Sequence, residues 1–182
     1  MKLRKITALL AGLTVALATL VVMAAPAGAR PFCPISWGSL AKAAGEHGLA
    51  PLGQVRAGRH DCFDRVVFEI DGPAPGYRVE YVSEVLTEGQ GAVLPLAGRA
   101  RLRVVLLANV FDELGHLHYS GRVGDRLDVA GYKTLRDVKV GGCFEGQSTF
   151  GVGVRARLPF RVFTLPGPGD HSRIVLDVAH RW

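Results

Sequence analysis

Short segments in which every second residue is apolar, separated by turns rich in Gly and Pro, place the strongest constraint on how this chain folds. Val66, Phe68 and Ile70 would share one face of such a segment. Similar patterns recur at 77–81, 100–110, 135–140, 149–158, 160–165 and 173–178. No stretch shows continuous helical periodicity. Strands at this short, regular spacing predict an all-β sandwich.

The connections between these segments carry further predictions. The Pro- and Gly-rich turn at 71–76 predicts a hairpin between the strand ending at Ile70 and the strand at 77–81. Pro95 limits 93–96 to a short edge strand, and the polar stretch 111–129 predicts a loop with a short strand. Residues 30–54 are expected to form an irregular arm, in which 40–47 favours two helical turns after Ser39.

The first 29 residues have the pattern of a signal peptide. A basic start is followed by residues 6–29, which carry no charge and end in the small residues Ala27-Gly28-Ala29. A membrane anchor is the alternative, because such a run is long enough to span a bilayer. Gly12, Pro26 and the small residues favour cleavage after Ala29. We therefore predict a secreted or cell-envelope protein with no stable membrane span after cleavage.

Charge adds a weak constraint on partners. The formal net charge is +6, and removal of three basic residues with the signal peptide lowers it to +3. A mild positive balance outside the cell suits anionic wall polymers. Nucleic acid is disfavoured by the compartment and by the absence of a cluster of Lys and Arg.

Residues 30–182 have the length of one domain.

The three cysteines allow one disulfide and leave one thiol. In an oxidising compartment a bridge from Cys33 to Cys62 would tether the arm to the first strand, which the chain-entropy model values at about 3–4 kcal/mol. Cys143 would be the free thiol. A catalytic cysteine working with His60 or His171 is disfavoured, because no nucleophile signature surrounds any of the three.

Two segments repeat the same residue types in the same order. Arg65-Val-Val-Phe-Glu-Ile70 and Arg173-Ile-Val-Leu-Asp-Val178 match as Arg, β-branched, Val, large apolar, acid and β-branched. The repeat suggests two similar halves with the matched strands in equivalent places.

A set of motifs, in chain order, resembles the AMIN-like domain of secreted actinobacterial proteins over about residues 55–182. The motifs are Arg56-x-Gly58-x-His60, Phe63-Asp64-Arg65, Gly76-Tyr77-x-Val79-x-Tyr81, Gly142-x-Phe144-Glu145-Gly146, Pro159-Phe160-Arg161-Val162 and Arg173-x-Val-x-Asp177-Val. The arm with Cys33 and Cys62 is similar to the variant with an extra cysteine pair. The predicted organisation is thus a signal peptide (1–29), a disulfide-tethered arm (30–54) and an AMIN-like domain (55–182).

The resemblance implies a sandwich of two related antiparallel sheets and a non-catalytic envelope-targeting function. The parent AMIN domain directs amidases and secretin-type pores to the envelope, with peptidoglycan as the proposed ligand. We therefore expect a non-enzymatic module without a cofactor, whose partner is peptidoglycan or another wall polymer. The alternative is a protein-interaction module that docks on an envelope protein through an exposed sheet edge.

Four polar residues are the tentative ligand-binding set: Arg59, His60, Glu145 and Arg173. The planar fork of arginine suits carboxylate and phosphate groups, and loops concentrate binding residues. Asp64, Arg65 and Asp177 are expected instead to form structural pairs.

Two other kinds of site are weaker interpretations of the same residues. Glu69 and Asp177 could serve as the two carboxylates of a glycan hydrolase, which is the least favoured function. No metal site is expected, because the histidines at 60, 116, 118 and 171 lack the spacing of metal ligands.

Overall fold

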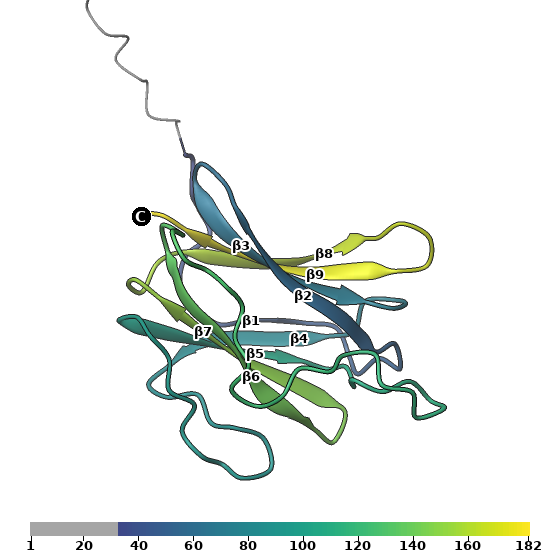
Figure 1. Cartoon of the computed structure of the whole chain (residues 1–182). Helices are drawn as coiled ribbons and strands as arrows, with labels where there is room; N and C mark the ends of the chain where they lie inside the picture. The colour runs from purple at the N-terminus through teal and green to yellow at the C-terminus, as the bar shows by residue number, and fades with distance from the viewer. Residues whose placement is uncertain (1–32) are drawn as a thin grey trace, which may run out of the picture. The chain divides into compact units, whose positions relative to one another are not determined.

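The computed structural model describes residues 33–182, which form two antiparallel sheets packed face to face (Figure 1). The five-stranded sheet has the order β1 (Lys42–Ala44), β4 (Tyr77–Val82), β5 (Ala100–Leu106), β7 (Gln147–Val154) and β6 (Leu135–Phe144). The four-stranded sheet has the order β2 (Leu52–Arg59), β3 (Phe63–Ile70), β9 (Ser172–Ala179) and β8 (Phe160–Pro166). The predicted all-β sandwich is confirmed. The predicted signal peptide lies outside the described residues.

The core forms where the apolar faces of the two sheets meet. Val66, Phe68 and Ile70 on β3 are fully buried, as their alternation predicts. Phe68 packs against Phe150 of β7, with ring centroids 5.0 Å apart, and so joins the two layers. Burial of such large side chains is the main stabilising contribution in a sandwich of this kind. Within residues 33–182, no helix is long and apolar enough to cross a membrane.

The predicted hairpin across the turn at 71–76 is wrong. β3 belongs to the four-stranded sheet and β4 to the five-stranded sheet, so the turn carries the chain from one layer to the other. Both strands have an apolar inner face, and placing them in opposite layers buries both faces against each other. Gly76 permits the crossing, because a Cβ there would lie 2.5 Å from the carbonyl of Gly45.

The predicted arm contains more regular structure than expected. Its helical turns are wrong, since Lys42–Ala44 form β1 on the edge of the five-stranded sheet and Gly45 ends it with φ 71. The second strand, β2, begins at Leu52, inside the predicted arm, and ends at Arg59. Arg59 therefore ends a strand instead of lying on the expected loop, while His60 follows in the β2–β3 turn.

The other irregular stretches are close to their predictions. The edge strand expected at 93–96 is reduced to a single bridge between Leu86 and Val93. The loop at 111–129 holds bridges instead of a strand, and its later part covers the outer edge of β6. There the amide of Leu127 donates to the carbonyl of Val138 at 2.9 Å. This cover protects an edge that would otherwise expose unpaired backbone groups.

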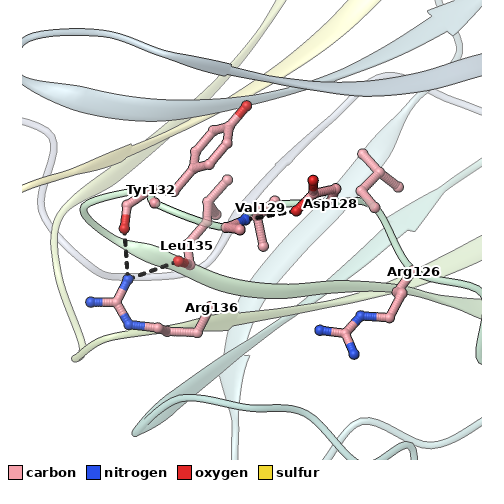
Figure 2. Close-up of a pocket in the computed structure, with 9 residues that line it drawn as sticks. Arg126, Asp128, Val129, Tyr132, Leu135 and Arg136 are labelled. Carbon is pink, nitrogen blue, oxygen red and sulfur yellow. Dashed lines mark hydrogen bonds between the residues drawn. The ribbon is translucent and has the colours of Figure 1, made fainter.

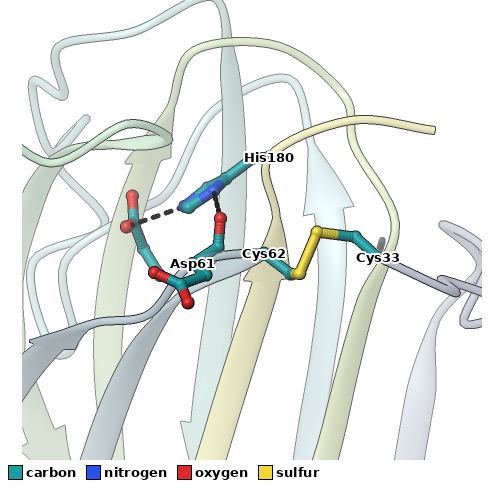
Figure 3. The surroundings of a disulfide bond; sticks show 5 residues. Cys33, Asp61, Cys62 and His180 are labelled. Carbon is teal, nitrogen blue, oxygen red and sulfur yellow. Dashed lines mark hydrogen bonds and ion pairs between the residues drawn. A yellow bond between two sulfur atoms is a disulfide. The ribbon is translucent and has the colours of Figure 1, made fainter. Parts of the chain in front are cut away.

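The disulfide between Cys33 and Cys62 is present as predicted, and Figure 3 shows it beside His180 and Asp61. His180 Nδ1 lies 3.0 Å from the carbonyl oxygen of Asp61, which ties the end of β9 to the β2–β3 turn. Cys143 is the free cysteine of the described residues. Beyond the disulfide the arm packs Trp37 edge-on against Phe63, with centroids 5.6 Å apart.

Candidate binding surface

The repeated segments are neighbours in one sheet, a finding that explains the repeat. β3 and β9 pair antiparallel, with Arg65 opposite Asp177 and Glu69 opposite Arg173. Each strand carries its arginine four residues before its acid. Antiparallel pairing therefore sets each arginine opposite the acid of the other strand, on the outer face of the four-stranded sheet. The matched strands do not occupy equivalent places in two separate halves.

At one end of this outer face, Asp177 joins two arginines. Arg65 donates to both of its carboxylate oxygens, Nε at 2.6 Å and Nη2 at 2.9 Å, and Arg161 Nε donates at 2.8 Å. Asp177 is fully buried, whereas the side chain of Arg161 is 40% exposed. The carboxylate thus holds two guanidinium groups in fixed orientations and leaves a net positive charge at the surface.

Aromatic rings surround the more exposed of these arginines. The guanidinium carbon of Arg161 lies 4.4 Å from the ring centroid of Trp37, 4.9 Å from that of Phe163 and 5.5 Å from that of Phe63. Cation–π contacts at such distances hold the guanidinium over ring faces. Because Trp37 belongs to the disulfide-tethered arm, the arm contributes directly to this surface.

At the other end of the outer face, the arginine and the acid that lie opposite each other do not form an ion pair. Glu69 accepts a hydrogen bond from Arg56 at 2.7 Å, although Arg173 lies opposite it in register. Arg173 Nη2 instead donates to the carbonyl of Pro166 at 2.7 Å, and its Nε is buried without a hydrogen-bond partner among the described residues. A pocket of about 250 Å³ opens here, lined by Glu69, Asp71, Gly167, Pro168, His171, Ser172 and Arg173.

The four residues predicted to bind a ligand do not form one patch. Arg173 lines the pocket just described, whereas Arg59 lies under the opposite end of the same sheet, about 17 Å away along β3 at the usual rise per residue. Arg59 lies over the Tyr132 ring at 5.3 Å, and His60 stacks on Phe63 at 4.5 Å. Glu145 is exposed in the β6–β7 turn of the five-stranded sheet with φ 48.

Asp64, expected to form a structural pair, lies in the interior. It is 1% exposed and accepts hydrogen bonds from the backbone amides of Thr134 and Leu135. His180 Nε2 lies 3.0 Å from its other carboxylate oxygen. Asp64 therefore fastens the start of β3 to the start of β6 and to the end of β9, and it is not available to a ligand.

A second hollow was not predicted from the sequence. A pocket of about 560 Å³ lies along the segment that leads into β6, and Figure 2 shows Arg126 and Arg136 among the residues that line it. Arg136 donates to the carbonyls of Tyr132 at 3.0 Å and Leu135 at 2.8 Å, so its side chain is held in place. These two arginines belong to no motif, and only the packing of the loop on β6 brings them together.

Histidines and aspartates form a linked chain at the tip of the 111–129 loop. His118 Nδ1 lies 2.7 Å from Asp71 and its Nε2 lies 3.3 Å from Asp112, while His116 Nδ1 lies 2.9 Å from Asp112. His171 Nδ1 lies 3.2 Å from the other oxygen of Asp71. Within residues 33–182, no group of three or more such side chains is arranged to hold a metal ion.

These contacts shift two pKa values in opposite directions. Hydrogen bonds that the ring of His118 donates to Asp71 first and to Asp112 second raise the pKa of His118 above its ordinary value. Partial desolvation would raise the pKa of Asp112, but hydrogen bonds from the backbone and ring of His116, and then from His118, hold that pKa well below its ordinary range. The chain of contacts therefore favours a charged His118 between two carboxylates.

Comparison with known protein families decides which group this sandwich belongs to. The family model for the AMIN-like domain matches residues 50–180. The chain belongs to the AMIN-like domain family. No curated protein and no solved structure matches it significantly. The resemblance carried by the sequence motifs is thereby confirmed.

Membership in the AMIN-like family indicates an envelope-associated binding module. AMIN-like domains are generally non-catalytic, and the family implies an envelope or secreted location. The disulfide between Cys33 and Cys62 agrees with an extracytoplasmic environment.

Proposed function

We propose that this AMIN-like domain is a secreted, non-catalytic module that binds peptidoglycan through the outer face of its four-stranded sheet. Arg161, held by Asp177 and surrounded by Trp37, Phe63 and Phe163, is the observation that carries the proposal. Peptidoglycan offers sugar rings with apolar faces and stem peptides with carboxylates. Aromatic rings pack against the former, and a positioned guanidinium binds the latter.

The second part of the proposed surface is the pocket at Arg173, at the other end of the same face. Its lining places Glu69 beside Arg173, so the pocket offers groups of both charges within about 250 Å³. A stem peptide carries both amino and carboxylate groups, and such a pocket suits one residue of it. In this proposal Arg173 keeps the ligand-binding role expected from the sequence.

Hydrolysis of the glycan is not supported by the arrangement of the two strand carboxylates. Asp177 accepts guanidinium hydrogen bonds on both oxygens, and Glu69 is paired with Arg56. A glycan hydrolase needs one carboxyl group that gives a proton to the leaving oxygen and a second that faces the sugar. Asp177, fully buried beneath two arginines, lacks access for either role.

Co-sedimentation with purified, insoluble peptidoglycan at low salt tests the proposal. The protein should pellet with the wall material, and Arg161→Ala should weaken this binding by roughly tenfold, since a hydrogen bond to a charged group contributes about 1.5 kcal/mol or more. Arg103→Ala is the matched control, because Arg103 is also paired with an acid, Glu80, but on the five-stranded sheet. Absence of the wild-type protein from the pellet would refute peptidoglycan binding.

A protein partner is the second candidate, and the free edge of β2 is the observation that favours it. β2 is eight residues long and, within residues 33–182, pairs only with β3 in its sheet. Leu52 donates to the carbonyl of Asn109 at 2.8 Å, so the part of this edge beyond Leu52 is the part that can accept another strand. A proline within β2, at Gln54→Pro, should abolish capture of an envelope protein and leave wall sedimentation unchanged. If the same change abolishes sedimentation alone, the edge is not a protein-docking site.

A further inference from the structure

The surface beside the start of β6 concentrates arginines that have few acidic partners. Arg126 and Arg136 line the 560 Å³ pocket, and a second hollow of about 390 Å³ is lined by Gly98, Arg99, Arg136, Arg155 and Ala156. Arg136 lines both, so the two hollows are neighbours. We call the four residues Arg99, Arg126, Arg136 and Arg155 the arginine surface.

The arginine surface carries more positive than negative charge. One carboxylate lines the larger pocket, that of Asp128, which accepts a hydrogen bond from the amide of Ala130. Arg136 is bonded to backbone carbonyls, and Arg155 Nη2 donates to the carbonyl of His180. Arg99 has no side-chain polar partner among the described residues. Arg126 lies 3.9 Å from Asp137, which is itself shared with Lys139 at 3.4 Å. Backbone carbonyls orient these guanidinium groups but do not neutralise them, so anions from outside are attracted.

This surface differs in chemistry from the outer face of the four-stranded sheet. On that face Glu69 and Asp177 balance part of the arginine charge, and aromatic rings surround Arg161. The hollow at Arg99 and Arg155 has no aromatic lining and is open to solvent. It therefore lacks the flat apolar surfaces that bind sugar rings and offers mainly charge.

We propose that the arginine surface binds a polymer chain that bears phosphate groups. Such a chain repeats its negative charge at every unit, and so it can place one phosphate in each of the two hollows on either side of Arg136. Arginine binds phosphate oxygens with two parallel N–H donors, and several such contacts act together along a chain. The carboxylates of peptidoglycan stem peptides are separated by sugar and amino-acid units. They therefore lie further apart than the phosphates of such a chain and match the closely spaced arginines less well.

Titration of the purified protein with short-chain inorganic polyphosphate tests this proposal. Binding should weaken steeply as salt is raised, as expected when arginines replace the counterions of a polyanion. The double variant Arg99→Ala/Arg126→Ala should bind at least about tenfold more weakly. Both side chains are exposed and hold no backbone group, so the variant should keep the wild-type melting temperature. Arg136→Gln, which also removes the backbone contacts, provides a second variant.

The control Arg78→Ala/Arg103→Ala removes the same charge from exposed positions on β4 and β5. It should leave polyphosphate binding within about twofold of wild type. An equal loss of affinity in both double variants would show that binding depends on net charge alone, and it would overturn the assignment to the arginine surface. Polyglutamate bound as tightly as polyphosphate would overturn the assignment to phosphate. Vesicles of phosphatidylglycerol bound more tightly than polyphosphate would overturn the assignment to a polymer.

The polyphosphate experiment tests the arginine surface separately from the proposed peptidoglycan binding. Arg161→Ala should reduce wall sedimentation and leave polyphosphate binding unchanged, and Arg99→Ala/Arg126→Ala should do the reverse. Failure of polyphosphate binding with intact wall sedimentation refutes only the arginine surface. The opposite result, polyphosphate binding without wall sedimentation, refutes only the proposed peptidoglycan binding.

Discussion

Asp177 shows how one side chain organises the surface of this AMIN-like domain. It is fully buried, yet its two oxygens fix Arg65 and Arg161, whose side chains are 22% and 40% exposed. A buried carboxylate is tolerated at such a position because the guanidinium groups satisfy both oxygens. The same contacts that stabilise the β3–β8–β9 region therefore present Arg161 for binding.

We predict that Asp177→Ala lowers the free energy of unfolding by about 3 kcal/mol, the lower end of the range for breaking a buried ion pair. The lower end applies because both arginines are partly exposed and regain water. Chemical denaturation monitored by tryptophan fluorescence would measure the change. Asp128→Ala, which removes an exposed loop carboxylate, is the control and should stay within about 0.5 kcal/mol of wild type. Equal stability of the two variants would contradict a structural role for Asp177.

At the scale of elements, the disulfide-tethered arm joins stability to the candidate surface. The bridge closes a segment with a sequence separation of 29, and the arm then places Trp37 against Phe63 and Arg161. We predict that Cys33→Ser/Cys62→Ser lowers the free energy of unfolding by about 3–4 kcal/mol. Thermal and chemical unfolding under oxidising conditions would measure it.

The same double variant should also weaken binding to peptidoglycan, because Trp37 is then no longer held beside Arg161. Cys143→Ser is the control, since Cys143 is free, and it should change neither property by much. If the double variant loses stability but binds the wall as wild type does, Trp37 is not part of the binding surface.

The loop at 111–129 provides a second prediction at this scale, through the contacts of His118 with Asp71 and Asp112. The pKa of His118 is raised in the folded protein, so its contribution to stability is full below the unfolded value of 6.5 and is lost as pH rises through the folded value. Asp112, whose pKa is lowered, contributes in the ionised state throughout this range. We therefore predict that the free energy of unfolding falls between about pH 6 and about pH 8.

His118→Asn should flatten this dependence, because it removes the titrating group between the two carboxylates. His47→Asn is the control, as His47 is exposed and lies outside the cluster of Asp71, Asp112, His116, His118 and His171. Denaturation at the two pH values measures the difference for each protein. A wild-type stability that rises over the same interval would contradict the assigned direction.

Elements were predictable from the sequence where every second residue is apolar. In β3, β5 and β9 the residues at this spacing, such as Phe68, Val104 and Leu176, are fully buried against the other sheet, and the alternation identified the strands. β2 was missed because it is an edge strand whose Gly53, Gly58 and Ala57 give little alternation of size. The wrong hairpin at 71–76 has a similar cause, since the turn residues are compatible with a hairpin or a crossing, and only the packing of both apolar faces selects the crossing.

The candidate surfaces were predictable only where chemistry follows a strand. Arg65, Arg173 and Asp177 stood out because they repeat along two strands, although their pairing in one sheet was not foreseen. The arginine surface gave no signal, because Arg99, Arg126, Arg136 and Arg155 come from four separate places in the chain. Only the fold brings them together, so no local pattern predicts them.

At the scale of the whole molecule, the predicted signal peptide determines which charges the exported domain carries. Its basic residues account for half of the formal net charge, which falls from +6 to +3 on removal. The remaining positive charge lies in part on the arginine surface and on the outer sheet face, where it is available to anions. Proposals for both surfaces therefore assume an exported domain, consistent with the envelope or secreted location that the family implies.

We predict that the exported protein begins at Arg30, because Ala27 and Ala29 supply the small residues that signal peptidase requires before the cut. Intact-mass measurement of protein recovered from the medium or envelope of an expressing bacterium would locate the new N-terminus. Ala27→Phe/Ala29→Phe should block the cut and retain the longer chain in the membrane fraction, where residues 6–29 are long enough to span the bilayer. Leu52→Ala, which destabilises the folded domain without touching the cut site, should leave the N-terminus at Arg30 and lower only the yield. An uncut wild-type chain in the membrane fraction would replace the secreted module with an anchored one, and the two binding surfaces would then act next to the membrane.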